Sequence, residues 1–211
     1  EENGLTNLKI SKRRFIYLIS PNKINKNFYN NLKLVLKTNK VSFFQMRLKK
    51  YSLKQKIIIG KKIKRVCESH KVKFIINDDP WLTKKLDADG CHLGQKDMII
   101  NEARKIIGDK IIGVTCHNSI KLAKNAIKSK ASYLAFGAFY SSKTKKTKFN
   151  ATTKTLIKVK KLTNIPIVAI GGINASNYKN LLLNKANFLA ISDYIWNNKK
   201  YKPEKATDIL K

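Results

Sequence analysis

Short apolar runs alternate with longer amphipathic segments along the whole chain. The runs occupy residues 15–20, 42–47, 73–78, 90–94, 111–115, 133–138, 166–172 and 188–192. Each has the length and continuous apolar content of a strand that is buried on both faces. The segments between them, such as 53–69, carry apolar residues at every third or fourth position, as expected of a helix that covers a sheet. The pattern therefore predicts eight repeated strand–helix units.

Repeated units of this kind form either an open, doubly wound sheet or a closed barrel, because their crossovers are right-handed. Eight units in 211 residues, with no GxGxxG after the first run, favour an α/β protein of the (β/α)8 TIM-barrel class. No linker rich in Pro, Gly or Ser interrupts the chain. We expect one domain over 1–211, with an N-terminal extension (1–14), a barrel (about 15–197) and a C-terminal tail (198–211). Its chemistry should lie at the C-terminal ends of the strands.

The composition indicates a globular protein with a sizeable core, since 43% of the residues are hydrophobic. No run approaches the roughly 18 apolar residues of a membrane span, and residues 1–11 lack the apolar stretch of a signal peptide. Cys67, Cys91 and Cys116 are odd in number and form no CxxC pair. Packed thiols in a reducing cytoplasm are expected rather than disulfides or metal ligands. The prediction is a cytoplasmic protein without a membrane partner.

The formal net charge of +32 raises the alternative of a non-catalytic, nucleic-acid-binding protein. The excess is nearly all Lys, is spread over the whole chain, and is accompanied by abundant Asn and Ile, the residues that an AT-rich genome favours. Nucleic-acid modules instead concentrate Arg and exposed aromatic residues on one element. Codon bias is the preferred explanation, and no specific nucleic-acid partner is expected. A positive field would help to capture phosphorylated substrates.

Cationic and amide side chains follow the second predicted strand. Gln45, Arg47 and Lys49 alternate along the chain and so point to one side. An Arg and a Lys at the mouth of a barrel form an anion site, although an ion pair at the rim explains them equally well. The sequence leaves both readings open at this point.

Carboxylates follow the third and fourth predicted strands. Asn77, Asp78 and Asp97 reach the same rim from neighbouring strands. Two carboxylates beside phosphate-binding cations suit Mg²⁺, which prefers oxygen ligands and shares its coordination sphere with phosphates. The alternative is a pair of helix caps or ion-pair partners. Asp79 precedes Pro80 and is expected to cap the next helix.

Two later strand ends are candidates for phosphate binding. After the sixth strand, Ser142, Thr144 and Lys145 belong to a run of hydroxyl and Lys residues that suits a phosphate clamp, although a solvated charge run is the default explanation. Gly172 ends the seventh strand and Ser192 ends the eighth, which is where many barrels of this class bind phosphate. None of the three His residues receives a role, although His117 is a better candidate than His92.

Taken together, these strings resemble the thiamine phosphate synthase (thiamine-phosphate pyrophosphorylase) family. The matching strings are QMRLK, FIINDDPWLTKKLDADGCHLGQKD, IIGVTCHN, YLAFGAFYSSKTKK, IPIVAIGGI and FLAIS. They occur in the family's order and spacing from about residue 15 to 192. The block from NDD to HLGQKD is the most specific of them. Ala138 and Ser141 replace prolines that are frequent in the family, which puts the rigidity of the following loop in doubt.

The resemblance implies a reaction and a role for each position. A pyrimidine diphosphate, 4-amino-2-methyl-5-hydroxymethylpyrimidine diphosphate, condenses with a thiazole phosphate to give thiamine phosphate and diphosphate, through Mg²⁺-assisted departure of the diphosphate. Asp78 and Asp97 would bind Mg²⁺, and three cations would stabilise the departing diphosphate as catalytic residues: Arg47, Lys49 and Lys145. The implied substrate-binding residues are Gln45, Arg47, Lys49, Asn77, Thr115, Ser142, Thr144, Lys145, Gly172, Ile191 and Ser192.

A thiazole tautomerase with the same barrel is the nearest alternative. The QMRLK, NDD, GQKD and SKTKK strings argue against it, because a tautomerase needs neither a diphosphate site nor a metal site. Phosphorylated small molecules are therefore the expected partners. The sequence leaves open whether the protein is a monomer or a homo-oligomer.

Overall fold

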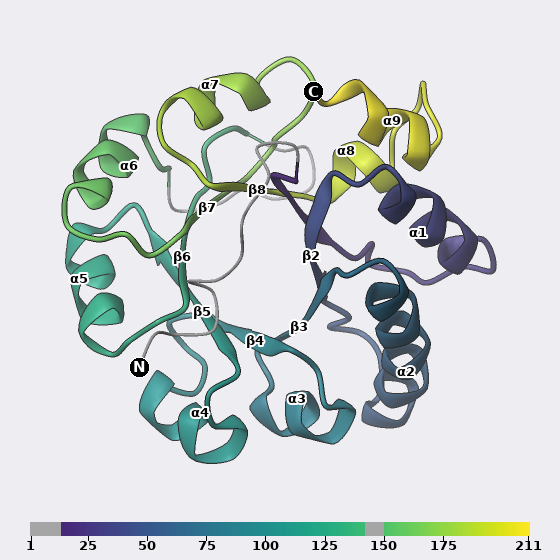
Figure 1. The fold of residues 1–211 in the computed structure, drawn as a ribbon, viewed down its shortest axis with the longest axis horizontal. Coiled ribbons are helices and arrows are strands. Elements are labelled where there is room, and N and C mark those ends of the chain that lie inside the picture. Colours follow the sequence, from purple (N-terminus) through teal and green to yellow (C-terminus); the bar gives the residue numbers. More distant parts are fainter. Residues whose placement is uncertain (1–13, 142–149) are drawn as a thin grey trace.

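The computed structural model describes residues 14–141 and 150–211 and contains a closed barrel of eight parallel strands in sequence order. Figure 1 shows the strands as an inner ring with the helices outside it. The predicted barrel is confirmed, and each predicted run overlaps a strand. The strands are β1 (Ile16–Ile19), β2 (Val41–Met46), β3 (Lys73–Asn77), β4 (Gly90–Leu93), β5 (Ile111–His117), β6 (Tyr133–Phe136), β7 (Ile167–Ile170) and β8 (Phe188–Ile191).

Pairing between the first and last strands closes the barrel. Ile16 lies opposite Leu189 and Leu18 lies opposite Ile191 in a parallel register. Every other strand pairs with its neighbours in sequence. All eight strands consequently end at the same rim, which is the edge where the polar residues were expected to meet.

Helices follow the strands and cover the barrel. They are α1 (Phe28–Lys37), α2 (Leu53–Ser69), α3 (Pro80–Leu86), α4 (Ile100–Ile107), α5 (Ile120–Lys128), α6 (Thr153–Lys160), α7 (Tyr178–Leu183), α8 (Asp193–Trp196) and α9 (Pro203–Ile209). None of these helices is long and apolar enough to cross a membrane.

Local sequence signals explain where several helices begin. A capping box starts α2, because the Ser52 hydroxyl accepts from the backbone N–H of Gln55 while the Gln55 side chain accepts from the N–H of Ser52. Asp79 caps α3 by accepting from the N–H of Leu82 at 2.9 Å, and Pro80 occupies the first helical position. The predicted capping role of Asp79 is confirmed.

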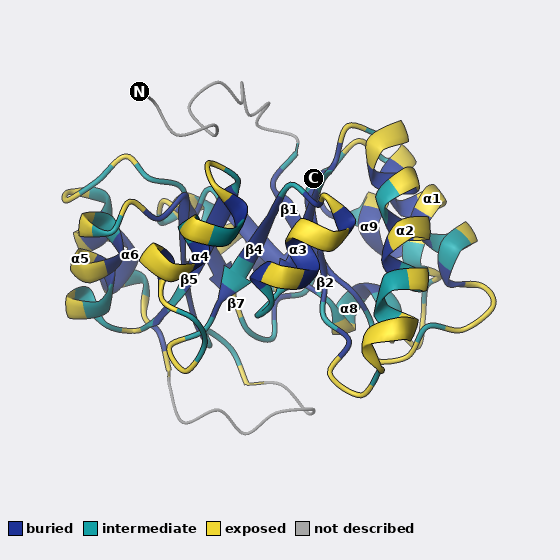
Figure 2. Ribbon diagram, turned by 90° about the horizontal axis from the view of Figure 1, so that it is seen from below, coloured by how far each residue is buried: buried dark blue, intermediate teal, exposed yellow. Residues whose placement is uncertain are grey.

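The core has two layers, one inside the barrel and one between the strands and the helices. Tyr17, Phe43, Tyr133 and Phe188 lead the inner cluster and are almost fully buried. Figure 2 shows buried strands at the centre and helices whose outward faces are exposed. Because side chains alternate along a strand, the residue two places after an inward-facing one also faces the interior. This parity turns Gln45, two places after Phe43, into the barrel.

The expected C-terminal tail, residues 198–211, contains a helix. Within 198–211, α9 packs against α1 and α8, and Ala206 and Leu210 are fully buried. The Lys40 ammonium donates to the carbonyl of Asp208 at 2.7 Å, and the Tyr194 hydroxyl donates to the carbonyl of Ala206 at 2.8 Å. The apolar residues of this segment were too few for the sequence to reveal this packing.

The three cysteines are buried and unpaired, as predicted. Burial raises the pKa of the Cys67 thiol far above its usual range and the pKa values of Cys91 and Cys116 to about 12. These thiols are therefore protonated at neutral pH and serve as packing groups.

Candidate active site at the barrel mouth

Cationic side chains follow β2 at the mouth of the barrel. The backbone N–H of Arg47 donates to the hydroxyl of Ser20 at 2.8 Å, which ties the end of β2 to the end of β1. Arg47 is half-buried and Lys49 is exposed. Both charges lower the pKa of Asp78, against the larger influences that raise it. The structure thus brings the predicted cations and one predicted carboxylate together.

Asp78 and Asp97 form a carboxylate pair beside these cations. Burial is the largest influence on Asp78 and raises its pKa, and the hydrogen bond and negative charge of Asp97 raise it further. The carboxylate of Asp97 also accepts from the N–H of Gly94 at 2.7 Å. Asp78 has a left-handed backbone (φ 66°), and its N–H donates to the carbonyl of His92 at 2.8 Å. Two oxygen-bearing groups that crowd one another in this way share a proton or bind a cation.

The donor set fits Mg²⁺ better than a transition metal. Among residues 14–141 and 150–211, no three His, Cys, Asp or Glu side chains form a metal-binding cluster. Mg²⁺ typically uses one or two protein carboxylates and completes its octahedron with water and substrate phosphate. Asp78 and Asp97 are the residues that would hold it.

A buried hydrogen-bonded chain crosses the barrel just beneath the mouth. The Gln45 amide nitrogen donates to the Tyr17 hydroxyl at 2.9 Å, and the hydroxyls of Tyr17 and Tyr133 lie 2.6 Å apart. The Tyr133 hydroxyl lies 2.9 Å from Nδ1 of His92, and Nε2 of His92 lies 2.7 Å from Oγ1 of Thr115. The chain therefore links two predicted substrate-binding residues, Gln45 and Thr115, through three residues that received no role from the sequence.

Burial sets the protonation states along this chain. It lowers the pKa of His92 to about 4, with Asp97 raising that value and Arg47 lowering it further. Burial also raises the pKa values of Tyr17 and Tyr133 well above the usual range. At neutral pH the imidazole is uncharged and both phenols keep their protons. The sequence ranked His117 above His92, but the structure places His92 inside the site; burial lowers the pKa of His117 as well.

Asn77 and Thr115 complete this side of the mouth. Asn77 ends β3 opposite His92 of β4, two places after the inward-facing Ile75. The carbonyl of Thr115 accepts from the side-chain amide of Gln95 at 2.5 Å. Both predicted residues therefore lie at the same rim as Gln45 and the carboxylate pair.

A glycine turn follows β7 on the opposite side of the mouth. Gly172 follows β7 with φ 61°, and a Cβ there would lie 2.8 Å from the carbonyl oxygen of Tyr140 and 2.9 Å from that of Ser141. Only glycine fits this turn without strain. The carbonyl of Gly172 accepts from the Asn177 side chain at 3.0 Å, which holds the turn in place.

Ile191 ends β8 beside this turn, and Ser192 follows it. Ile191 is buried, and the Ser192 hydroxyl donates to the carbonyl of Ser20 at 3.3 Å. The two predicted phosphate-binding strand ends are adjacent, since β7 pairs with β8. Three other predicted residues, Ser142, Thr144 and Lys145, lie outside the described residues.

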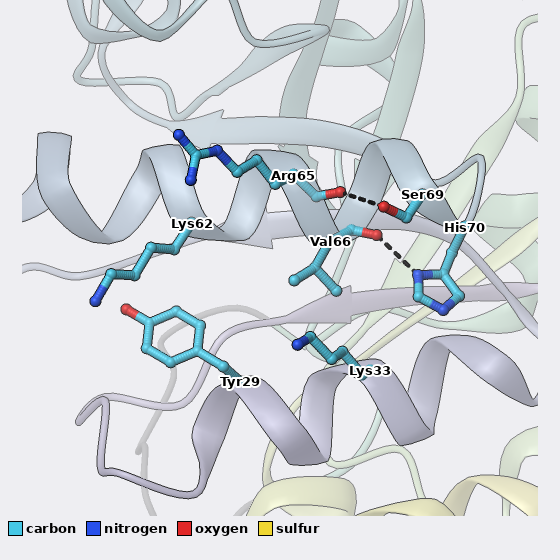
Figure 3. A pocket seen from close by; sticks show the side chains of 7 residues that line it. All are labelled: Tyr29, Lys33, Lys62, Arg65, Val66, Ser69 and His70. Carbon is cyan, nitrogen blue, oxygen red and sulfur yellow. Dashed lines mark hydrogen bonds between the residues drawn. The ribbon is translucent and has the colours of Figure 1, made fainter.

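A groove of about 360 Å³ lies elsewhere, between α1 and α2 (Figure 3). Tyr29, Lys33, Lys62 and Arg65 are among its lining residues, and Lys62 lies over the Tyr29 ring at 5.3 Å. The hydrogen bonds drawn there, from Ser69 to the carbonyl of Arg65 and between His70 and the carbonyl of Val66, are local to α2 and its end. None of the predicted site residues lines this groove, so the candidate site remains at the mouth.

Comparison with known proteins places the chain in a family. The sequence model of thiamine monophosphate synthase matches residues 16–195. A protein named thiamine-phosphate synthase from Pelagibacter ubique is 67% identical over 204 residues, covering 96% of this chain and 98% of the relative. One of the same name from Erythrobacter litoralis is 40% identical over 187 residues, covering 86% and 87% of the two chains.

Solved structures agree with the sequence relatives. A thiamine phosphate pyrophosphorylase from Pyrococcus furiosus has a TM-score of 0.83 and 27% identity, with 94% of each chain covered. An orotidine 5'-phosphate decarboxylase from Pyrococcus horikoshii has a TM-score of 0.65 at 12% identity, covers 92% of this chain and 96% of its own, and supports the fold alone. These matches favour neither the tautomerase nor the nucleic-acid-binding alternative. The chain belongs to the thiamine monophosphate synthase family and is a transferase of thiamine biosynthesis.

Proposed function

We propose that the mouth of this barrel joins the pyrimidine diphosphate to a thiazole phosphate, with diphosphate as the leaving group. The supporting observation is the carboxylate pair of Asp78 and Asp97 beside Arg47 and Lys49 at the ends of adjacent strands. Such a group of charges suits a diphosphate and a divalent cation. A tautomerase would have no use for it.

The demanding step is heterolysis of the CH2–O bond to the diphosphate. The electron-rich aminopyrimidine stabilises the cationic methylene, and the bond's electron pair leaves with the diphosphate. The thiazole nitrogen then attacks the methylene and forms the new C–N bond. Because the developing charge is on the leaving group, the residues that accelerate this step act electrostatically, and no protein nucleophile is required.

Specific side chains would share this work. Arg47 and Lys49 would hold the diphosphate, and Lys145 would meet it from the segment after β6. Gln45, Asn77 and Thr115 would orient the pyrimidine. Mg²⁺ held by Asp78 and Asp97 would neutralise part of the diphosphate charge.

The thiazole phosphate would bind across the mouth, at the turn of Gly172 and at Ile191 and Ser192. Backbone N–H groups at a glycine turn suit phosphate, because no side chain blocks the approach of its oxygens. Ser142 and Thr144 would add hydroxyl donors. Both substrates would then lie in one mouth, with the methylene of the pyrimidine facing the nitrogen of the thiazole.

An assay with both substrates tests this function. Thiamine phosphate and diphosphate should form in equal amounts, only when both substrates and Mg²⁺ are present. Turnover of a thiazole phosphate alone would instead support the tautomerase. Absence of product from both substrates with Mg²⁺ would contradict the proposed function.

We also propose that the protein works in the cytoplasm. Three buried thiols, none in a disulfide, support a reducing compartment. Fractionation of the native cells, followed by detection of the protein in each fraction, tests this location. Size-exclusion chromatography with light scattering would measure whether the protein is a monomer or a homo-oligomer.

A further inference from the structure

The buried chain from Gln45 to Thr115 has a direction that its donors and acceptors determine. Each link joins two groups, and each hydroxyl has one proton to donate. The Gln45 nitrogen can only donate, so the Tyr17 oxygen accepts at that link. Among the described residues the Tyr17 hydroxyl has one other partner, the hydroxyl of Tyr133 at 2.6 Å. Tyr17 therefore donates its proton to Tyr133.

The same count continues through the imidazole. Tyr133 accepts from Tyr17, so its own proton goes to its remaining partner, Nδ1 of His92 at 2.9 Å. Nδ1 is then the unprotonated nitrogen, and Nε2 carries the hydrogen. Nε2 donates to the Thr115 hydroxyl at 2.7 Å. Thr115 thus accepts inside the barrel, and its own proton is left for a group at the mouth.

The opposite direction would leave a buried donor without an acceptor. If Thr115 donated to His92, then Nδ1 would donate to Tyr133, and Tyr133 would donate to Tyr17. Tyr17, which is 1% exposed, would accept from both neighbours and keep an unused O–H. Buried hydroxyls without an acceptor are rare in folded proteins, because no hydrogen bond offsets the free-energy cost of removing the hydroxyl from water.

The barrel is shaped to hold this chain. A Cβ at Gly113 of β5 would clash with the ring of Tyr133, so a glycine at this position lets that ring lie across the interior. The rings of His92 and Tyr133 stack at 5.7 Å with 16° between their planes, and the Tyr17 ring packs edge-on to Tyr133 at 5.6 Å. These contacts fix the imidazole and both phenols in one arrangement.

We infer that His92 is a positioning residue, whose Nε2–H holds the Thr115 hydroxyl as a hydrogen-bond donor toward the pyrimidine diphosphate. A hydroxyl in bulk water donates and accepts interchangeably. A fixed donor suits the oxygens of a diphosphate and the ring nitrogens of a pyrimidine, all of which are acceptors. The Gln45 amide, at the other end of the chain, is held through the same links.

Nitrogen-15 NMR of the histidines tests the direction without any substrate. The chain has three His, and the resonances of His92 are identified by their loss in His92→Leu. We expect a neutral ring with hydrogen on Nε2 and an unprotonated Nδ1 at pH 7.5. A ring with hydrogen on Nδ1, or a charged ring, would overturn the inference.

Kinetics test the link to Thr115, and this arm rests on the proposed function. His92→Leu and Thr115→Val should each lower kcat/KM for the pyrimidine diphosphate by roughly 10- to 50-fold, the scale of one hydrogen bond to a charged group. The double variant should lose little more than the larger single loss, because both changes remove the same donor. Multiplicative losses would overturn the inference.

A conservative variant separates positioning from packing. His92→Gln places an amide N–H near the position of Nε2 and should recover several-fold of the kcat/KM that His92→Leu loses. KM for the thiazole phosphate should stay within about twofold in all variants, since that ligand binds across the mouth. Equal losses for Gln and Leu would contradict the positioning role. A wild-type protein without synthase activity would refute the proposed function, while the NMR result would still decide the direction of the chain.

Discussion

The two sides of the barrel mouth are built from different parts of the polypeptide. On the side of β2 to β4, charged side chains gather: Arg47 and Lys49 lie near the crowded pair of Asp78 and Asp97. On the side of β7 and β8 lie the half-buried turn of Gly171 and Gly172 and the hydroxyl of Ser192. The first side suits a ligand whose charge changes during reaction. The second suits a phosphate that is held without changing.

This difference predicts unequal responses to mutation. Removing a charge on the first side should lower kcat, because its electrostatic work increases as the diphosphate departs. Altering the second side should raise KM for the thiazole phosphate and change kcat less, because the phosphate is bound equally well in the ground state and in the transition state. Four experiments probe this contrast, in order of decreasing effect.

The largest effect is expected from Asp97→Asn. An amide oxygen can still accept from the N–H of Gly94, so the turn is retained while the charge is lost. We expect kcat to fall on the order of 10³-fold, in line with the loss of a group that supports metal-assisted charge stabilisation. A magnesium titration of kcat, with far-UV circular dichroism as a control for folding, measures this loss. Normal turnover by this variant in excess EDTA would show that no metal held by Asp97 is needed for the reaction.

Lys145→Ala asks whether the charged side extends to the segment after β6. Lys145 is expected to contact the departing diphosphate, so its loss should lower kcat by roughly 10²-fold. The matched controls are Lys143→Ala and Lys148→Ala, which remove equal charge from the same segment and should change kcat only a few-fold. Turnover is measured at saturating substrates and fixed salt. Equal losses for all three would mean that the segment acts as a diffuse positive field.

Ser192→Asp tests the second side. A carboxylate placed beside the bound phosphate should raise the Kd of the thiazole phosphate about tenfold through like-charge repulsion. The Kd of the pyrimidine diphosphate should change much less. Calorimetry measures both, and Ser69→Asp at the far end of α2 is the charge-matched control. An equal rise in the Kd of both substrates would show that they do not bind on separate sides of the mouth.

The smallest effect is expected in thermal stability rather than in turnover: Asp78→Asn should stabilise the metal-free protein slightly. The pKa of Asp78 is raised by burial and by Asp97, so the native state holds its proton more tightly than the unfolded state does. The stability gained from that proton is complete below about pH 3.9 and is lost as the pH rises through the raised pKa. In EDTA, the variant should therefore gain about 2 °C in Tm over wild type at pH 7 and less at pH 4.

The left-handed backbone at residue 78 makes this comparison clean, because Asn tolerates φ 66° as well as Asp does. Added Mg²⁺ should raise the Tm of wild type and leave that of the variant unchanged. A variant that is less stable than wild type at both pH values would show that burial and Asp97 do not destabilise the ionised form of Asp78.

The amino-acid sequence by itself determined the repeating architecture and the identity of the rim. Continuous apolar runs specify strands that are buried on both faces, and local signals such as the cap at Asp79 specify where helices begin, since both depend on residues a few positions apart. The ends of parallel strands must meet, so Arg47, Asp78 and Asp97 could be assigned to one mouth before any distance was known. Their specific roles came from resemblance to a family.

Only the tertiary structure decided what lies beneath that rim. The link between Tyr17 and Tyr133 joins residues 116 positions apart, and in the sequence each reads as an ordinary aromatic residue of a buried strand. Strand register decides which hydroxyls meet inside the barrel, and Gly113 matters only because a ring lies against it. The same reason explains why His92 received no role and why the sequence did not reveal that α9 packs against α1 and α8. Hydrogen bonds and packing between distant segments depend on which side chains share a small volume, and that is a property of the closed barrel.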